Sequence, residues 1–546
     1  MDTYNVKPIS SKMILPQTFP VPGEISNEIF ITAAPGEYEP ASLVIRAKED
    51  VEKLRIKPSP LKHRDGGNIP VENIDIKVVK CWYQTTTAWS GIHTRPKEGK
   101  KVLVPELLLY DDTLVRVDLA EQKNYIKLQL PQGNEYIWIS NPNELGGDKM
   151  KILSTEEYPI KDSTSLLPLR MSRNTNKQLW ITVKVPDEAR AGIYTGTIDF
   201  VREENVLASI SMKLRILPFE LAGPKTYYDL EQDFISSIYY RGKLSSRYPQ
   251  GSISSEFKSK EQLRAELKDM FAHGITNLTC YQGFDKELLA EYLKIKNEAG
   301  MCAVPLYYLG VSANSSPENI KNVLDFVKPF GISEVYFYGI DEASGERLKS
   351  QRIAWQANRE AGGKVFVAGG KNRNFEVMGD IQDLHICAGS PTKEEAAKWH
   401  SVGHKVFCYA NPQGGPENPE LWRRNFGLLL WKANYDGACT YCYQHSFGNV
   451  WNDFDHYHYR DHNVAYPTLN GVIDTIALEG YREAIDDVRY ATTLKLQIER
   501  AKRSGNERMK TEALSAEKWL SELDVNEDLD DIRSKIIDYI LRLTGD

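Results

Sequence analysis

Hydrophobic and polar positions alternate in short runs through the first 220 residues, and Pro, Gly, Asn and Asp separate the runs. Such runs cover residues 42–46, 74–79, 114–117, 180–185 and 210–214. Successive side chains of a strand point to opposite faces, so this pattern predicts strands with one buried face. Turn signals at this spacing favour a β-sandwich. We therefore predict an N-terminal all-β sandwich over residues 1–220.

The pattern changes after Leu217-Pro218, where strand-like runs begin to alternate with helical ones. The candidate strands are 227–232, 275–281, 302–308, 335–340, 364–367, 384–388, 405–410 and 438–444. Ser316-Pro317 and Asn418-Pro419 are typical of helix starts, and Gly362-Gly363 is typical of a helix end. Eight strands that alternate with helices predict a (β/α)8 TIM-type barrel over residues 221–470.

Residues 471–546 are helical and charged. Apolar residues recur with a spacing of 3.6 over 476–503, 508–523 and 528–543, which predicts three helices. We interpret these as a C-terminal helical segment packed on the barrel, with a separate interaction module as the alternative. Charged residues such as Glu483, Asp487 and Arg489 are interpreted as a solvated helix face.

Composition and charge narrow the class of protein. The chain has a net charge of −7, and no long basic run is present, which argues against nucleic acid as a partner. No apolar run approaches the roughly 20 residues of a membrane-spanning helix. The N-terminus lacks the charged and apolar regions of a signal peptide. We expect a periplasmic or extracellular protein whose export signal is absent from this sequence, and a cytoplasmic location stays open.

The seven cysteines are interpreted as buried thiols used as small hydrophobic side chains. Cys439 and Cys442 form a CxxC, but positions three apart on a strand face opposite ways, so neither a redox motif nor a zinc site is predicted. The segment 451–462 is rich in His and Asp. Its spacing matches no metal-binding pattern, and we interpret it as a solvated loop over the barrel mouth, with a metal site as the alternative. No metal and no cofactor is predicted.

Two adjacent carboxylates, Asp341 and Glu342, follow the apolar run at 335–340. In a barrel they come after strand four, at the end of the strands where such folds carry their chemistry. Two neighbouring carboxylates repel, which raises the pKa of one of them and suits a general acid. A solvated pair, or acids matched to a helix dipole, is the simpler interpretation. The barrel context favours a catalytic pair that acts on a sugar.

Adjacent carboxylates also favour one mechanism in particular. A sugar with a 2-acetamido group supplies its own nucleophile, the amide oxygen. The enzyme then needs one carboxylate to orient that amide and another to protonate the leaving oxygen. Aromatic and amide side chains at other strand ends are candidates to line the sugar subsite, with Trp451 and Tyr338 preferred: they are Tyr308, Tyr338, Tyr409, Asn411, Gln444 and Trp451. Glu231 and Asp233, on the predicted first strand, are further carboxylates.

The chain resembles glycoside hydrolase family 123, the β-N-acetylgalactosaminidase family. The resemblance rests on Tyr338-Gly339-Ile340-Asp341-Glu342, on Pro186 with the Gly192–Gly196 turn, and on the late segment 479–490. It implies a β-sandwich followed by a (β/α)8 barrel and a carbohydrate substrate. It also implies that Asp341 stabilises the acetamido group, whereas Glu342 is the general acid and then the base.

The resulting expectation is a retaining exo-β-N-acetylgalactosaminidase that uses substrate-assisted catalysis. One alternative is a glycosidase of the same architecture that acts on a different sugar and has a second catalytic carboxylate about 5 Å away on another strand. A second alternative is a carbohydrate-binding protein without catalytic activity.

Overall fold

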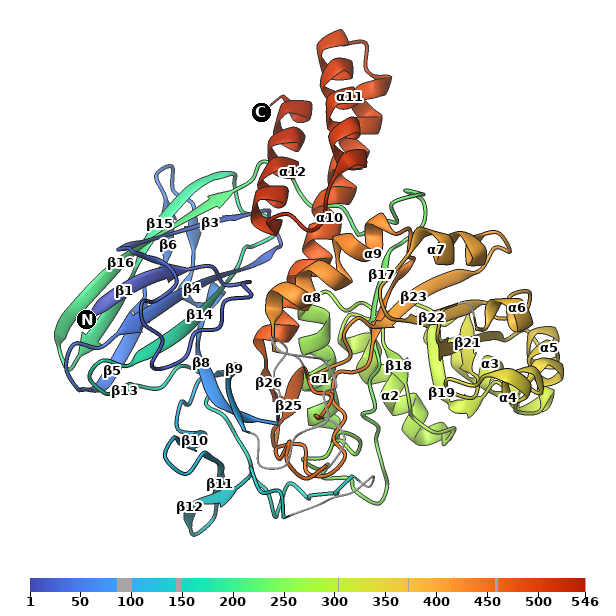
Figure 1. The fold of residues 1–546 in the computed structure, drawn as a ribbon, viewed down its shortest axis with the longest axis horizontal. Helices are drawn as coiled ribbons and strands as arrows, with labels where there is room; N and C mark the ends of the chain where they lie inside the picture. Colours follow the sequence, from blue (N-terminus) through green and yellow to red (C-terminus); the bar gives the residue numbers. More distant parts are fainter. Residues whose placement is uncertain are drawn as a thin grey trace.

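The computed structural model describes residues 1–85, 101–143, 150–302, 304–371, 373–415, 417–456 and 460–545. Three parts follow one another along the chain: an all-β part, a parallel barrel, and three C-terminal helices that stand between them (Figure 1). None of the helices in the described ranges combines the length and apolar character needed to cross a bilayer.

The first part is built from strands β1 to β16. They are β1 (Asp2–Val6), β2 (Glu24–Ile25), β3 (Glu28–Ala33), β4 (Tyr38–Arg46), β5 (Val51–Pro58), β6 (Leu61–His63), β7 (Asn68–Ile69), β8 (Ile74–Gln84), β9 (Val102–Leu109), β10 (Val115–Asp118), β11 (Lys123–Leu130), β12 (Gly133–Trp138), β13 (Leu169–Met171), β14 (Asn176–Lys184), β15 (Gly192–Arg202) and β16 (Asn205–Ile216). One sheet has the order β2-β1-β4-β14-β8-β9, a second runs β13-β5-β15-β16-β3 with β6 and β7 beside it, and β10-β11-β12 form a third. Buried side chains from all three belong to one hydrophobic core.

The second part is a nearly closed barrel of eight parallel strands. They are β17 (Ile235–Ile238), β18 (Thr279–Cys280), β19 (Leu306–Ser312), β20 (Val335–Tyr338), β21 (Lys364–Gly369), β22 (Leu384–Ala388), β23 (Lys405–Ala410) and β24 (Gly437–Thr440). The order β17-β24-β23-β22-β21-β20-β19-β18 leaves one seam between β17 and β18. The Asn277 backbone N–H donates to the Ser236 carbonyl at 3.3 Å across this seam.

Helices pack around the outside of the barrel. They are α1 (Lys260–Ala272), α2 (Lys286–Glu298), α3 (Pro317–Val327), α4 (Gly345–Lys349), α5 (Arg352–Glu360), α6 (Phe375–Met378), α7 (Lys393–His400), α8 (Pro419–Phe426) and α9 (Leu428–Lys432). Ser316 caps α3 and Asn418 caps α8, each with Pro in the first turn, and Gly362, with φ +99°, follows α5. The helix signals of the sequence are confirmed.

The first barrel strand was predicted wrongly at 227–232. That segment forms a turn in which the Thr226 N–H donates to the Gln232 carbonyl at 2.9 Å. The strand begins only at Ile235, which pairs with Gly437 of β24. Glu231 and Asp233 are therefore exposed and lie outside the barrel strands. Asp233 forms an isolated β-bridge with Lys225, and their side chains pair at 2.7 Å.

A hairpin and three long helices complete the chain. The hairpin is β25 (Ala465–Pro467) with β26 (Val472–Asp474), and the helices are α10 (Ile476–Arg503), α11 (Glu507–Glu522) and α12 (Leu529–Thr544). All three helices contribute to the core that also packs the barrel helices. The observed helices match the predicted ones to within one residue, because long amphipathic runs define helices well.

Glu483 and Asp487 of α10 are buried, and Arg489 is half-buried, so the interpretation of a solvated face was wrong for this part of the helix. Arg533 of α12 donates to Glu483 at 2.6 Å and to Asp487 at 2.7 Å. Tyr490 donates to Glu37 beside β4 at 2.8 Å. Asp487 also pairs with Arg423 of α8 at 2.7 Å. The segment 479–490 therefore contacts α12 and the barrel through buried ion pairs, and the all-β part through a hydrogen bond.

His273, at the end of α1, sits in the same junction. Its Nδ1 lies 3.2 Å from Asp269 and its Nε2 lies 3.5 Å from Glu479. Burial alone would lower the pKa of His273, but the two carboxylates outweigh it and raise that pKa to about 10. The imidazole is therefore held as a cation at neutral pH.

We expect His273→Gln to lower the free energy of unfolding by about 3 kcal/mol at pH 6, because it leaves buried carboxylates without their partner. A raised histidine pKa stabilises fully below the ordinary value of about 6.5, and this contribution is lost as the pH rises through about 10. Urea denaturation at pH 6, 8 and 10 tests this. The surface-pair variant Arg264→Gln is the control, and an equal deficit at all three pH values would contradict the assignment.

Candidate functional site

The carboxylate pair lies at the carboxyl end of the fourth barrel strand, as its place in the sequence predicts. β20 ends at Tyr338, and Asp341 and Glu342 lie in the turn that leads to α4. Both residues are partly exposed to solvent. Glu342 has φ +47°, a left-handed conformation that is rare for residues other than Gly, Asn and Asp. Its N–H donates to the Ala368 carbonyl of β21 at 3.2 Å, which ties the turn to the neighbouring strand.

Each carboxylate accepts a hydrogen bond from a different tyrosine. The Tyr338 hydroxyl donates to Asp341 Oδ1 at 2.7 Å. The Tyr409 hydroxyl, from β23 across the barrel, donates to Glu342 Oε1. Phenols that hold two adjacent carboxylates from different strands give the pair a fixed geometry.

The surroundings of Asp341 act on its pKa in opposing directions. Partial burial raises the pKa of Asp341 and the charge of Glu342 raises it further, whereas the Tyr338 hydrogen bond and Arg347 lower it. The balance leaves the pKa above its ordinary value.

More aromatic and cationic groups gather at the same end of the barrel. The Arg241 guanidinium lies over the Tyr281 ring at 5.3 Å and donates to the Tyr441 hydroxyl at 3.2 Å. Tyr239, directly after β17, is hydrogen bonded to Tyr338 at 2.9 Å. Sequence reasoning missed Tyr239 and Arg241, since it placed the first strand too early. The paired aromatic residues Tyr239-Tyr240 after an apolar strand were the available signal.

Three of the six predicted sugar-binding residues lie at the ends of β20 and β23. Tyr338 and Tyr409 contact the carboxylates directly. Asn411 follows β23, and its Nδ2 is a buried donor with no hydrogen-bond partner among the described residues.

The other three lie elsewhere. Tyr308 is fully buried in the layer between strands and helices, beside Phe337. Both amide atoms of Gln444 are already paired, with Lys258 at 2.7 Å and with Glu266 at 3.1 Å. Trp451 packs against Trp82 and Tyr466 in the core of the all-β part, so it is not a sugar platform.

The segment 451–462 is buried where it is described, so its interpretation as a solvated loop was wrong. Residues 457–459 lie outside the described residues. Arg460 pairs with Glu106 of β9 at 3.0 Å, and Asp453 accepts the Thr85 N–H at 2.9 Å. The segment therefore contacts the all-β part as well as the barrel. Among the described residues, two groups place three potential metal ligands together: His385 with Cys387 and Glu395, and Asp269 with His273 and Asp474. Neither includes the carboxylate pair.

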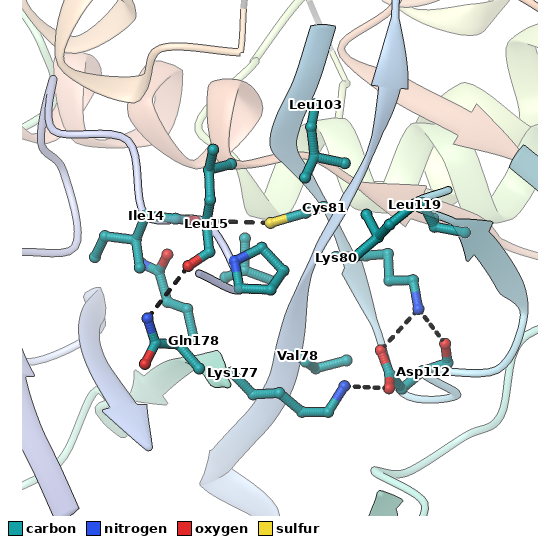
Figure 2. Close-up of a pocket in the computed structure, with 14 residues that line it drawn as sticks. Ile14, Leu15, Val78, Lys80, Cys81, Leu103, Asp112, Leu119, Lys177 and Gln178 are labelled. Atoms are coloured by element: carbon teal, nitrogen blue, oxygen red, sulfur yellow. Dashed lines mark hydrogen bonds and ion pairs between the residues drawn. The ribbon is translucent and has the colours of Figure 1, made fainter. Parts of the chain in front are cut away.

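A separate hollow of about 170 Å³ lies on the all-β part (Figure 2). Its lining residues come from β8, β9, β10, β14 and nearby loops, and none comes from the barrel. Lys80 donates to Asp112 Oδ1 at 3.0 Å, and Lys177 donates to the other oxygen of the same carboxylate. These two lysines outweigh burial and lower the pKa of Asp112. The carboxylate of this hollow is thus an ion-paired Asp112, and the acid–base candidates Asp341 and Glu342 lie in the barrel instead.

Of three comparisons with known proteins, only the one with solved structures found matches. No family model matches the chain, and no curated protein matches it. Among solved structures, a family 123 glycoside hydrolase from Clostridium perfringens, studied for glycolipid glycan hydrolysis, is 12% identical with a TM-score of 0.66. The match covers 100% of this chain and 99% of that one.

Other matches include a family 17 β-1,3-glucanosyltransferase from Rhizomucor miehei, 13% identical over 41% of this chain and 92% of that one. A family 5 xyloglucanase from Bacteroides ovatus is 9% identical, and the match covers 84% of this chain and 98% of that one. Both have a TM-score of 0.25, at which no argument rests on them. Over its whole length, the chain therefore resembles a family 123 glycoside hydrolase in fold.

Proposed function

We propose that the protein is a glycoside hydrolase, specifically a retaining exo-β-N-acetylgalactosaminidase that uses substrate-assisted catalysis at Asp341 and Glu342. The observation that carries this proposal is the adjacent pair at the end of β20, with each carboxylate held by its own tyrosine. The proposal includes a β-sandwich arrangement of the N-terminal sheets, a domain boundary near residue 220 and another near residue 470.

In the proposed first step, the ionised Asp341 accepts the N–H of the 2-acetamido group. This makes the amide oxygen a better nucleophile, and that oxygen attacks the anomeric carbon as the glycosidic bond breaks. Glu342 gives its proton to the leaving oxygen. The product is an oxazolinium ion, whose positive charge the Asp341 carboxylate stabilises.

In the second step Glu342, now ionised, takes a proton from water. The water oxygen attacks the anomeric carbon and opens the five-membered ring. Two inversions at the same carbon give net retention. Adjacent carboxylates fit this scheme because the nucleophile comes from the substrate, so neither carboxylate needs to lie on the opposite face of the sugar.

Rates on aryl β-galactosaminides that carry N-acetyl, N-fluoroacetyl, N-difluoroacetyl and N-trifluoroacetyl groups test the nucleophile. Each fluorine withdraws electron density from the amide oxygen, so kcat should fall steeply along the series. A flat series would contradict substrate assistance and direct attention to a second carboxylate elsewhere in the barrel.

The proposed role of Tyr409 gives a further prediction. Tyr409→Phe removes the donor to Glu342, which becomes charged as it gives up its proton in the transition state. A hydrogen bond to a charged group contributes about 1.5–3 kcal/mol. We expect kcat/KM on an aryl β-N-acetylgalactosaminide to fall about 10- to 100-fold, with little change in thermal stability. Tyr336→Phe is the control because Tyr336 is equally buried in the barrel interior, at 4% exposure against 5%. Equal effects in the two variants would contradict the role.

A further inference from the structure

Tyr239 contacts Tyr338, the tyrosine that donates to Asp341. It follows β17, and its N–H donates to the Thr440 carbonyl of β24 at 2.9 Å, which fixes the backbone there. The side chain is 3% exposed. Its ring meets Tyr338 edge-on at 6.2 Å between centroids and packs on Tyr441 at 5.3 Å. Tyr239 is thus held rigidly with its hydroxyl 2.9 Å from that of Tyr338.

The hydrogen bonds of Tyr338 determine which group donates and which accepts between Tyr239, Tyr338 and Asp341. An ionised Asp341 can only accept, so the one hydroxyl proton of Tyr338 is used in the 2.7 Å bond to Oδ1. The Tyr338 oxygen must then accept from Tyr239. It also accepts the Ala368 N–H at 3.3 Å. The result is a directed relay: Tyr239 donates to Tyr338, and Tyr338 donates to Asp341.

We infer that Tyr239 is a positioning residue for Asp341, and that it acts through Tyr338 to hold the carboxylate in place and in its ionised form. The hydrogen-bond relay is independent of the substrate. Its consequence for turnover rests on the proposed function, in which an ionised Asp341 orients the acetamido group.

The charges around Asp341 make the hydrogen bond from Tyr338 important for its protonation state. The titratable groups that face or influence it are Glu342 and Arg347 on its own segment, and Tyr239, Tyr281, Tyr338, Tyr409 and Tyr441 from other strand ends. Arg347 is exposed and Glu342 is negative. Donation from Tyr338 is therefore the principal short-range interaction that favours the charged form.

Loss of either tyrosine hydroxyl should make protonation of Asp341 easier. Tyr338→Phe removes the direct donor and should raise the Asp341 pKa by about one unit. Tyr239→Phe removes the support behind that donor. Since neighbouring hydrogen bonds strengthen one another only in part, we expect a rise of about 0.3–0.5 units.

Carboxyl 13C NMR of protein labelled selectively at aspartate tests the inference without any substrate. The Asp341 signal is assigned by its loss in Asp341→Asn, and its pKa is then measured in wild type, Tyr239→Phe and Tyr338→Phe. Tyr307→Phe is the control, because Tyr307 is also 3% exposed inside the barrel. We expect rises in both relay variants, the larger in Tyr338→Phe, and none in the control. An unmoved Asp341 signal in a folded Tyr239→Phe protein would overturn the inference.

The pH dependence of kcat/KM separates this inference from the proposed function. If Asp341 must be ionised for turnover, the acid limb should move to higher pH in Tyr239→Phe by the shift that the NMR titration gives. A moved carboxyl signal with an unmoved acid limb would uphold the relay and contradict the role proposed for Asp341 in turnover. An absence of any turnover would contradict the proposed function, and the NMR titration would still decide the relay.

Discussion

We expect Glu342→Gln to lower kcat about 10³-fold on a substrate with a poor leaving group, the largest effect of any single substitution in the barrel. The amide cannot donate the proton that the leaving oxygen needs, and general acid catalysis contributes about 10²–10⁴ in rate. The expected loss is much smaller for a dinitrophenyl glycoside, because that leaving group departs without a proton. Steady-state rates on a series of aryl glycosides measure the difference.

Glu346→Gln is the matched control for this prediction. Glu346 lies four residues further along, in α4, and its side chain is 92% exposed. We expect its rates to equal those of wild type. An equal loss on good and poor leaving groups in Glu342→Gln would show that Glu342 is not the general acid.

The second large effect is expected from Asp341→Asn. The amide keeps the size of the carboxylate and can still accept from Tyr338, but it loses the negative charge that stabilises the oxazolinium ion. We expect kcat/KM on an aryl β-N-acetylgalactosaminide to fall about 10²- to 10³-fold, a loss typical of one electrostatic group in an active site. The measurement is kcat/KM at the pH of the wild-type optimum.

Asp325→Asn is its control, since Asp325 is an exposed carboxylate on α3. Asp341→Asn should also weaken the binding of a thiazoline that mimics the bicyclic intermediate. The dissociation constant should rise by a factor comparable to the fall in kcat/KM. Undiminished thiazoline binding would contradict a role in stabilising that intermediate.

The place of the carboxylate pair could be predicted from sequence because its signal is local. An apolar strand that ends in two acids and leads to a helix needs only the strand–helix alternation to be assigned to the barrel mouth. The phenols that hold the pair were harder to predict. Tyr239 contacts Tyr338 although 99 residues separate them in sequence, and no local pattern records such a contact.

The strand pattern also leaves open which of its two faces is interior. Tyr307 and Tyr308 are neighbours on β19, yet Tyr307 lies inside the barrel and Tyr308 lies under the helices. A parallel strand buried on both faces is apolar throughout, so its two faces look alike in sequence. The pairing of Gln444 could not be predicted either, because its partner Lys258 precedes α1 and is distant in sequence.

Charge patterning was misleading for α10. Glu483, Asp487 and Arg489 have the spacing of a solvated helix face, but the partner that buries Glu483 and Asp487 is Arg533, about 50 residues later. A paired buried charge and an exposed one have the same sequence signature. Only the packing of α12 on α10 distinguishes them.

The most direct test of the account is nitrophenol release from matched β-N-acetylgalactosaminide, β-N-acetylglucosaminide and β-galactoside substrates, with wild type and Glu342→Gln side by side. The account predicts turnover by wild type that is restricted to acetamido sugars, fastest on the galacto-configured one. With a less reactive aryl leaving group, Glu342→Gln should lose that turnover. Comparable turnover of the β-galactoside, or no turnover of any of the three, would contradict it.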